Sequence, residues 1–572
     1  MTPRLRPLIV CEYIQRELLW PLRQQTTNGF QQLNAGDHLM SLYRFTLTLG
    51  VALAALLIYG LLFVGRRARH LPPGPPTLPV IGNAHQIPSK GAHYRLTEWA
   101  KQYGGIYSLK LGPGTAIVLT DRRLVREILD KRSAVSSGRP MSTVAQKLIG
   151  SDDHLLVMDY GPKWRDMRKL IQQELTAAAC EREYVELQEA EAAQMLRNFV
   201  EAPDRLMDHP KRFSNSVIMS IMFGTRTPDN DTPHMTRLYD VLHDFQKVME
   251  LGATPPVDLF PLLKWVPERW LGHWITRANK VGRSLDSLYG DILQATIQRR
   301  EQSGSNRSVM DKVLDRQEEE KLNLTRHQLE FLGGVAMEGG SETTAAAILS
   351  FIKAMTCFPK AQAQAQVEID AAIGEDRSPK WSDREKLPYV LQIVKETMRW
   401  RPVGGVDVPH ALSEDVWFEG MLLPKGSILL LNVWGLHQDE KRFDDPATFE
   451  PDRYAHCHQL ANEYAVSSDY EARDHYNYGA GRRLCPGIHL AERNMFIAVA
   501  ELLWAFSFQK KVDDKGDPIE PDLDYATGFE EGLVICSKPF PCEIKPRSQR
   551  RVETIMREFQ VAEAEIFPQY AW

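Results

Sequence analysis

One cysteine lies in a loop whose composition suits a flat, iron-containing ligand. Residues 478–487 read YGAGRRLCPG, so three glycines and two arginines surround Cys485 just before a helical pattern that begins at Ile488. Glycine lets a backbone approach a flat ligand closely, and the start of a helix favours an anion such as a thiolate. Arg482 and Arg483 can offset that thiolate or the carboxylates of a ligand. A lone thiolate of this kind suits an axial ligand of haem iron; the alternative is a buried structural cysteine.

A second set of residues lies in one long helix that the sequence predicts over residues 325–358. Thr325 begins it as part of a capping box. Its middle contains two glycine pairs, 333–334 and Gly339-Gly340. Each glycine in a helix costs about 1 kcal/mol relative to alanine, so something must require them. We expect Gly339 and Gly340 to let haem and O2 approach the backbone, and close helix packing is the alternative.

An acid and an alcohol follow the second glycine pair. Activation of O2 needs protons, which the Thr343 hydroxyl can pass on through a held water and which Glu342 can relay from solvent. The alternative for Thr343 is a hydrogen bond to the carbonyl four residues earlier. Glu338 lies one turn before Glu342, and a buried carboxylate is costly unless it is paired. It binds a polar substrate, joins the proton relay, or pairs with another side chain.

These two motifs resemble those of the cytochrome P450 family. The cysteine loop is similar to the haem-binding signature F-x-x-G-x-R-x-C-x-G, in which Tyr478 replaces the usual phenylalanine. The matching positions are Gly481, Arg483, Cys485 and Gly487. GGSETT resembles the family motif [AG]-G-x-[DE]-T-[TS]. The resemblance covers roughly residues 70–545 and implies haem b, with Cys485 as axial ligand of the iron.

Further motifs follow in the family's order. Glu396 and Arg399 match its E-x-x-R pair, and Arg453 in FEPDRY holds the position of the arginine with which that pair locks. Residues at i and i+3 lie on one helix face and can pair. The resemblance gives these three a structural role, which is to hold the cysteine loop.

The resemblance also implies residues that face the haem propionates and the substrate. Trp164 and Arg168 match the W-x-x-x-R motif, and His410 holds a position that donates to a propionate in many relatives. The candidate lining of the substrate pocket is Val335, Glu338, Val406, Asp407 and Phe529.

Composition and patterning give the fold class. The chain has 572 residues, of which 43% are hydrophobic and 25% charged, with a net charge of −5, so nothing draws it to nucleic acid. Seven scattered cysteines without CxxC argue against a disulfide framework and a closed zinc site. Helical patterns dominate, with a hairpin predicted over 105–120 and strands near 403–409, 415–431 and 533–544. We expect a mainly α fold with small β-sheets, the cytochrome P450 fold, as one catalytic domain over 79–545.

The ends of the chain are expected to lie outside that domain. Residues 45–64 form an uncharged run long enough to span a membrane, and residues 65–78 are a basic, proline-rich linker. The distribution of arginines leaves the orientation of the span ambiguous, since five precede the span and three follow it. A start at Met40 would leave only one arginine ahead of the span. We therefore expect 1–44 to be an N-terminal extension, of which 1–39 are either a mis-assigned start or a removable segment, and the domain to be cytosolic on the endoplasmic reticulum membrane. A cleaved signal peptide is the alternative. The tail, 546–572, carries one helical apolar stripe and is expected to pack on the body.

The resemblance implies a monooxygenase that inserts one atom of O2 into a C–H bond of a small molecule. The sequence as a whole is similar to those of fungal secondary-metabolism enzymes, which suggests an aromatic or polyketide-type substrate. Electrons would come from NADPH through cytochrome P450 reductase, with cytochrome b5 as an optional second donor. The candidate docking residues for an acidic partner are Arg165, Arg168, Lys169 and Arg482. One alternative is a haem enzyme that needs no external electrons, namely a peroxide-driven enzyme, an isomerase or a dehydratase. The other is a non-enzymatic haem protein.

Overall fold

A computed structural model describes residues 35–250, 252–532 and 534–570. The chain divides into two units, 1–64 and 65–572. The first contains helix α3 (Ala35–Phe63), in which residues 40–63 are long and apolar enough to cross a membrane; no other helix in the described ranges is. The question of a start at Met40 concerns residues that lie largely outside the described ones.

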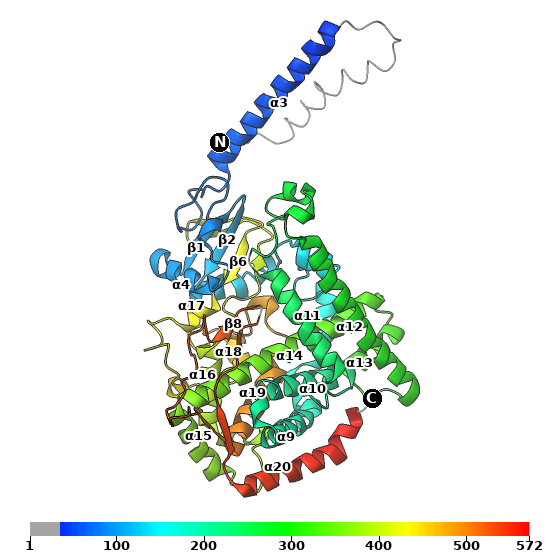
Figure 1. The fold of residues 1–572 in the computed structure, drawn as a ribbon, viewed down its shortest axis with the longest axis vertical. Helices are drawn as coiled ribbons and strands as arrows, with labels where there is room; N and C mark the ends of the chain where they lie inside the picture. The colour runs from blue at the N-terminus through cyan, green and yellow to red at the C-terminus, as the bar shows by residue number, and fades with distance from the viewer. Residues whose placement is uncertain (1–34, 251, 533, 571–572) are drawn as a thin grey trace. The chain divides into compact units, whose positions relative to one another are not determined.

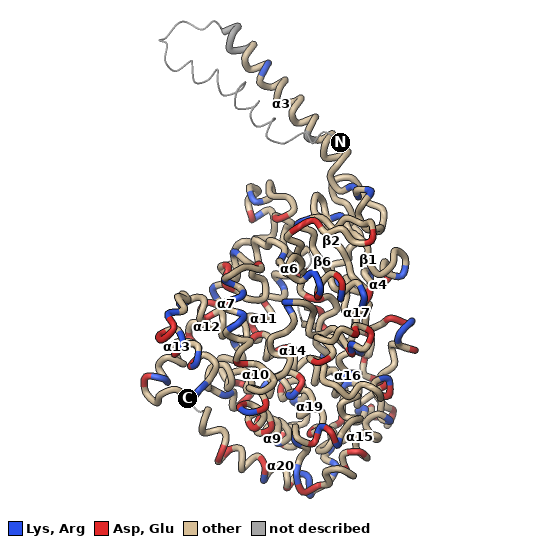
Figure 2. Tube along the Cα trace, turned by 180° about the vertical axis from the view of Figure 1, so that it is seen from behind, with Lys and Arg blue, Asp and Glu red and all other residues tan. Residues whose placement is uncertain are grey.

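The second unit is mainly helical (Figure 1). Its two longest helices are α12 (Trp274–Ser303) and α14 (Arg326–Cys357). The other helices are α4 (Ala92–Tyr103), α5 (Arg122–Val125), α6 (Ser133–Ser136), α7 (Pro162–Glu174), α8 (Ala177–Ala179), α9 (Val185–Glu201), α10 (His209–Phe223), α11 (Pro233–Met249), α13 (Val309–Glu319), α15 (Pro359–Ala372), α16 (Pro388–Trp400), α17 (Val433–His437), α18 (Ala461–Val466), α19 (Ile488–Ala505) and α20 (Gln549–Val561). Lys and Arg are interspersed with Asp and Glu along this unit (Figure 2).

The β-structure is small. One sheet has four strands in the order β1-β2-β6-β3, with bounds Ile106–Leu111, Gly114–Leu119, Ile428–Leu431 and His410–Ala411. Strands β1 and β2 form the predicted antiparallel hairpin, while β2 and β6 run parallel. The remaining strands form three pairs: β4 (Val416–Phe418) with β5 (Met421–Leu423), β7 (Phe506–Gln509) with β10 (Glu543–Pro546), and β8 (Phe529–Glu530) with β9 (Cys536–Ser537). The strand predicted over 403–409 is absent from that segment; pairing with β6 begins only at His410.

Helix α14 has the predicted capping box at Thr325, and three of its four glycines serve packing. A Cβ at Gly333 would lie 2.6 Å from the Phe223 ring, and one at Gly334 would lie 2.4 Å from the Tyr289 ring. A Cβ at Gly340 would lie 2.5 Å from Ile218 on α10. The prediction that Gly340 opens the backbone to a ligand was therefore wrong, because this glycine lets α10 approach.

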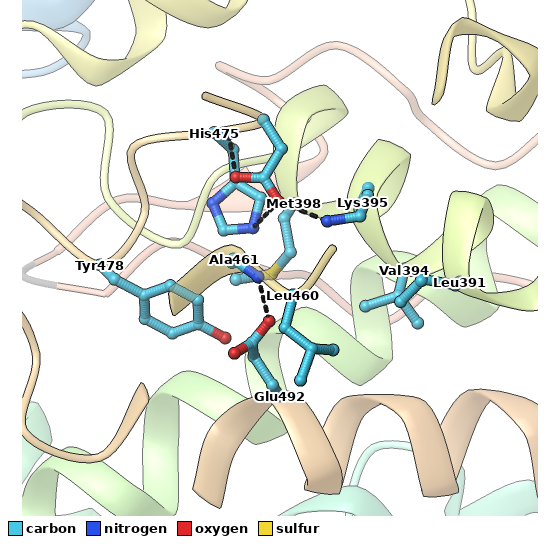
Figure 3. A pocket seen from close by; sticks show the side chains of 10 residues that line it. Leu391, Val394, Lys395, Met398, Leu460, Ala461, His475, Tyr478 and Glu492 are labelled. Carbon is cyan, nitrogen blue, oxygen red and sulfur yellow. Dashed lines mark hydrogen bonds and ion pairs between the residues drawn. The ribbon is translucent and has the colours of Figure 1, made fainter. Parts of the chain in front are cut away.

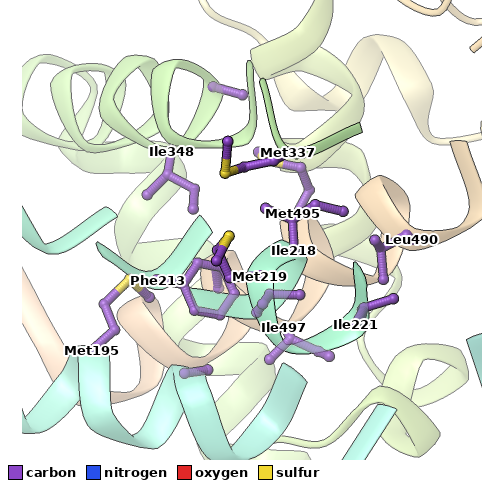
Figure 4. Close-up of a cluster of buried hydrophobic side chains, with 14 of the residues drawn as sticks. Met195, Phe213, Ile218, Met219, Ile221, Met337, Ile348, Leu490, Met495 and Ile497 are labelled. Carbon is purple, nitrogen blue, oxygen red and sulfur yellow. The ribbon is translucent and has the colours of Figure 1, made fainter. Parts of the chain in front are cut away.

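A shared apolar core fixes α14 against its neighbours. Side chains of α10, α14 and α19 interdigitate in it (Figure 4), among them Ile218 and Met219 of α10, Met337 of α14, and Met495 of α19. Each of these side chains is at most 3% exposed, and burying one contributes about 1.5–3 kcal/mol. The core therefore holds α14, the helix that carries Glu342 and Thr343, beside α19, the helix that follows the cysteine loop. We call Glu342 and Thr343 the acid–alcohol pair and α14 the acid–alcohol helix.

The C-terminal tail packs on α9, as predicted. Phe559 of α20 lies under Arg197, and Phe567 lies 3.5 Å from the Arg226 guanidinium. The main-chain N–H group of Arg226 also donates to the Tyr570 carbonyl at 3.1 Å. The tail thus belongs to the folded body up to its last described residue.

Candidate active site

The cysteine loop is a tight turn that ends at the N-terminus of α19. Gly479 and Gly481 have positive φ angles of 73° and 62°, which favour glycine. A Cβ at Gly481 would lie 2.2 Å from the carbonyl oxygen of Leu129, so this position has no room for a side chain. The N–H group of Cys485 donates to the Tyr478 carbonyl at 2.9 Å. The loop therefore presents one thiol in a fixed position.

The surroundings of Cys485 both oppose and support a thiolate. Burial raises the pKa of its thiol, whereas Arg168 and the N–H group of Gly487 act in the opposite direction. A thiol that coordinates a metal ion is deprotonated outright. The charge of Arg168 and the Gly487 amide would then stabilise the coordinated sulfur.

Three arginines and one histidine lie around this loop; we call Arg139, Arg168, His410 and Arg483 the cation cluster. Arg483 donates to two main-chain carbonyls at 2.9 and 2.8 Å, and Arg168 donates to the Leu484 carbonyl. Arg139 donates to three carbonyls at 2.6–2.9 Å. Burial lowers the pKa of Arg139 to about 10 and of Arg483 to about 9. So many buried cations favour an anionic ligand.

Asp407 supplies a carboxylate to this cluster. Its Oδ2 atom lies 3.7 Å from His410 Nε2, and a Cβ at Gly479 would lie 3.0 Å from the same oxygen. His410 and Arg139 help to hold the pKa of Asp407 below its usual range, although burial opposes them. This corrects the prediction for Asp407: its carboxylate lies against the cysteine loop and the cation cluster instead of lining a substrate pocket.

The cation cluster fits the carboxylates of haem. Three of its nitrogen atoms are buried without a hydrogen-bond partner: Arg168 Nε, His410 Nε2 and Arg483 Nη1. Leaving a buried arginine donor unpaired is costly, and two propionates would satisfy the donors of Arg168 and Arg483. Gly339 is exposed, and a Cβ there would meet no atom within 4 Å, which leaves its backbone accessible to a flat ligand. With Cys485 as the sulfur donor, these residues fit haem.

Trp164 contributes to the cluster by stacking. Its indole N–H donates to the Leu155 carbonyl at 3.2 Å. The guanidinium of Arg483 lies 4.2 Å from the Trp164 ring and that of Arg168 lies 5.7 Å from it. The ring therefore orients both arginines through cation–π contacts.

Replacing Arg483 by leucine is expected to weaken haem retention about 10- to 100-fold, because charged hydrogen bonds contribute about 1.5–3 kcal/mol. The measurement is the rate at which the purified protein loses haem to an excess of an acceptor globin. Arg482→Leu is the matched control, since Arg482 is an exposed neighbour. Equal loss rates for the two variants would contradict a role of Arg483 in holding the propionates.

The acid–alcohol pair lies on α14 with different partners for each residue. The hydroxyl of Thr343 donates to the Gly339 carbonyl at 2.7 Å, which is the alternative considered from the sequence, and its lone pairs remain acceptors. Glu342 accepts a hydrogen bond from Gln246 of α11 at 2.9 Å. Burial raises the pKa of Glu342 to about 7. The carboxyl can therefore exchange protons near neutral pH.

Glu338 is paired, and the structure identifies both partners. The hydroxyl of Tyr289 from α12 donates to its Oε1 atom, and His154 Nε2 lies 3.2 Å from Oε2. The His154 side chain is 1% exposed and stacks parallel to Phe245. Glu338 thus links α12, α14 and the segment before α7 in one polar contact.

Of the three other predicted pocket residues, one belongs to an apolar cluster and two border such clusters. Phe529 is 1% exposed and lies between Lys353 and Arg401, which corrects its assignment to the substrate pocket. Val406 is half-buried against the cluster between α4 and the four-stranded sheet. Val335 is half-buried on α14 beside the main core.

The predicted structural triad forms. Glu396 and Arg399 are both 0% exposed and join through two hydrogen bonds of 2.6 and 2.7 Å. Arg453 Nε lies 3.6 Å from the same carboxylate. Arg399 also donates to three main-chain carbonyls of the segment before Arg453 at 2.9–3.2 Å. The triad thereby fastens α16 to that segment.

A small pocket lies beside Tyr478 of the cysteine loop (Figure 3). Its lining comprises Leu391, Val394, Lys395, Met398, Leu460, Ala461, Asp474, His475, Tyr478 and Glu492. Lys395 and Asp474 form a buried ion pair of 2.6 Å. Burial raises the pKa of Glu492 to about 7, and its carboxylate accepts from the Ala461 N–H. The hydroxyl of Tyr478, where the motif has phenylalanine, is directed towards Glu492 (Figure 3).

A lone cysteine before a helix, a cation cluster suited to propionates and a helix that carries an acid–alcohol pair define a class of protein, the haem-thiolate oxidoreductases. Comparison agrees with this class. The family profile "Cytochrome P450" matches residues 72–530. The chain belongs to the cytochrome P450 family and is a haem-iron monooxygenase.

The curated proteins that the chain resembles include fungal monooxygenases. The chain is 52% identical over 529 residues to "Cytochrome P450 monooxygenase macC" of Penicillium terrestre, covering 92% of this chain and 98% of the relative. It is also 52% identical to the monooxygenase yanC of Aspergillus niger, covering 91% and 99%. Among solved structures, a zebra fish cytochrome P450 with progesterone superposes with a TM-score of 0.64 at 25% identity, covering 80% of this chain and 99% of the other. This superposition bears out the predicted fold class.

Sequence reasoning missed the partners that come from distant segments. Arg139 lies outside the recognised motifs, and nothing in its neighbours marks it as a member of the cation cluster. His154, Tyr289 and Gln246 likewise carry no motif. The helical spacing on α11 is the one available signal for Gln246, since it places that side chain on a defined face.

Proposed function

We propose that this chain inserts one atom of O2 into a C–H bond of a small aromatic or polyketide-type molecule, with electrons from NADPH. The observation that carries the proposal is the intact pair of Glu342 and Thr343 on α14, in a chain whose Cys485 loop and cation cluster fit haem b. Haem bound through a thiolate supplies the activation of O2. The similarity to fungal monooxygenases supports a secondary metabolite as substrate.

The residues of this chain would divide the work as follows. Cys485 holds the iron, and the cation cluster orients the cofactor through its propionates. Thr343 offers a hydroxyl oxygen as a hydrogen-bond acceptor for a water molecule. Glu342 takes up a proton near neutral pH and passes it on. The haem protein would need no further acid if Glu342 performs both steps.

The membrane and the electron donor are further parts of the proposal. Helix α3 would anchor the chain in the endoplasmic reticulum membrane, with residues 65–572 on the cytosolic side. Arg165, Lys169 and Arg482 are exposed and would dock the acidic surface of NADPH–cytochrome P450 reductase, with cytochrome b5 as a second donor. Arg168 no longer belongs to this set, because it bonds to Leu484 inside the protein.

The experiment that tests the proposal supplies the haem-loaded protein with NADPH, reductase and a panel of small aromatic compounds under ¹⁸O2. Incorporation of one labelled oxygen atom into a product, dependent on NADPH and reductase, is the expected result. Product formed from peroxide alone, or rearrangement without labelled oxygen, would favour the peroxide-driven or isomerase alternative. Haem binding without turnover on any compound would favour a non-enzymatic haem protein.

Replacing Glu342 by glutamine is expected to lower turnover by about 100-fold or more, the usual contribution of a general acid. Wild-type activity should fall as pH rises through about 7, where Glu342 loses its proton, and the variant should lack this step. The measurement is turnover between pH 6 and pH 8. An unchanged profile in the variant would remove Glu342 from the proton relay.

Stability provides the control for Glu342→Gln. Because the folded-state pKa is raised from 4.5 to about 7, the favourable contribution of this group is complete below pH 4.5 and is lost as pH rises through about 7. The amide variant should therefore unfold at a temperature that depends less on pH and is higher than that of the wild type at pH 8. Lower activity in a more stable protein would separate catalysis from folding.

A further inference from the structure

Helix α11 reaches the acid–alcohol helix through two long side chains. It packs mainly against α12. Tyr239 donates from its hydroxyl to the Ser341 carbonyl of α14 at 3.4 Å, and Gln246 donates from Nε2 to Glu342 Oε1 at 2.9 Å. Residues seven apart lie on one face of a helix. The position of α11 is therefore transmitted to Glu342 by side-chain hydrogen bonds.

Gln246 is restrained from its other side as well. A Cβ at Gly532 would lie 2.8 Å from Gln246 Oε1, so that segment approaches the amide closely. The amide group thus lies between Gly532 and Glu342, and its nitrogen donates to Glu342. The side chain is half-buried and has little freedom to turn away.

The remaining groups near Glu342 come from four elements. Lys211 of α10 favours the ionised carboxylate, and Glu338 of α14 disfavours it. Tyr239 of α11 and Cys536 of β9 are the other titratable neighbours, and burial raises the pKa of both. Within the described residues, Gln246 alone makes a direct side-chain hydrogen bond to the Glu342 carboxylate.

We propose that Gln246 is a positioning residue for Glu342, which holds the carboxyl group towards α11 and stabilises its ionised form after a proton has left. The proposal rests on the proposed role of Glu342 as the proton-relaying acid. A donor to a carboxylate favours the ionised form. Displacement of α11 would break this hydrogen bond, so the proton supply would follow the position of α11.

The test uses Gln246→Leu, which keeps the size of the side chain and removes its donor. The first readout is the infrared band of the protonated Glu342 carboxyl in the purified protein, assigned by its loss in Glu342→Gln, and followed against pH. The midpoint is expected to rise by about one pH unit in Gln246→Leu, the equivalent of one hydrogen bond. Tyr239→Phe should produce a smaller rise, because it loosens α11 without touching the carboxylate.

Gln294→Leu is the matched control, since Gln294 is an exposed glutamine on the neighbouring helix α12. It should leave the midpoint unchanged. An unshifted midpoint in Gln246→Leu would overturn the proposal, as would an equal shift in the Gln294 control.

A second readout is the fraction of NADPH electrons that the haem-loaded protein, with reductase, releases as H2O2. Because Glu342 would keep its proton to higher pH in Gln246→Leu, the pH dependence of this fraction should move upward by the same interval as the infrared midpoint. If no variant and no wild-type protein consumes NADPH, the proposed function fails, while the infrared midpoint still decides the role of Gln246. If oxygenation proceeds and the midpoint does not move, the role of Gln246 fails alone.

Discussion

Replacement of Cys485 by alanine is expected to abolish the red-shifted absorption band of the reduced, CO-treated protein, together with monooxygenase turnover. The physical reason is that axial donation from a thiolate distinguishes this class of haem protein. The close approach of Gly481 to the Leu129 carbonyl fixes the turn, so we expect no other residue of the loop to take the place of Cys485. The measurement is the CO difference spectrum of both proteins at equal haem content.

Another cysteine provides the control. Cys457 is half-buried and lies outside the cysteine loop, so Cys457→Ala should retain the red-shifted band. Persistence of the band in Cys485→Ala would mean that a different group ligates the iron. Absence of haem from both the wild type and the control would mean that the assignment of the haem site is wrong.

The second large effect is expected from Arg399→Leu, which should lower the free energy of unfolding by about 3–5 kcal/mol, as removing one partner of a buried ion pair does. It leaves Glu396, which is 0% exposed, without its two hydrogen bonds from Arg399, and it removes the donor of three main-chain carbonyls. Urea unfolding, monitored by circular dichroism, measures the change.

A double replacement distinguishes the cost of the unpaired charge from the loss of the contact. Glu396→Leu combined with Arg399→Leu removes both charges, and it should be less destabilised than Arg399→Leu alone. If the single variant unfolds within about 1 kcal/mol of the wild type, the triad does not fasten α16 to the segment before Arg453 in the way its geometry indicates.

Local patterns predicted the elements of the fold well. The capping box at Thr325 and the proline at 359 mark the bounds of α14, and the GPG turn marks the hairpin of β1 and β2. These signals act within a few residues, so they can be read from the sequence. The segment 403–409 contains three valines, which favour a strand, yet it makes no regular ladder: the Asp407 N–H group donates to the Leu431 carbonyl of β6, and paired residues begin only at His410.

The contacts of the site depend on segments far apart in the chain, which the sequence alone does not bring together. Gln246 meets Glu342 across 96 residues, and Arg483 meets the carbonyl of Met158 across 325. Gly340 illustrates the same limit, because its function depends on Ile218 of α10. A glycine that lets a helix approach and one that lets a ligand approach have the same sequence signature.

The tail has a consequence for how this enzyme can be engineered. Arg226, which stacks on Phe567 and bonds to Tyr570, also lies 3.1 Å from Glu191, and Glu191 is the buried partner of Arg212. Trimming the last described residues to attach a purification tag would uncover one member of a charge network in the protein interior. Tags and fusion partners are better placed ahead of residue 65, where the folded unit begins.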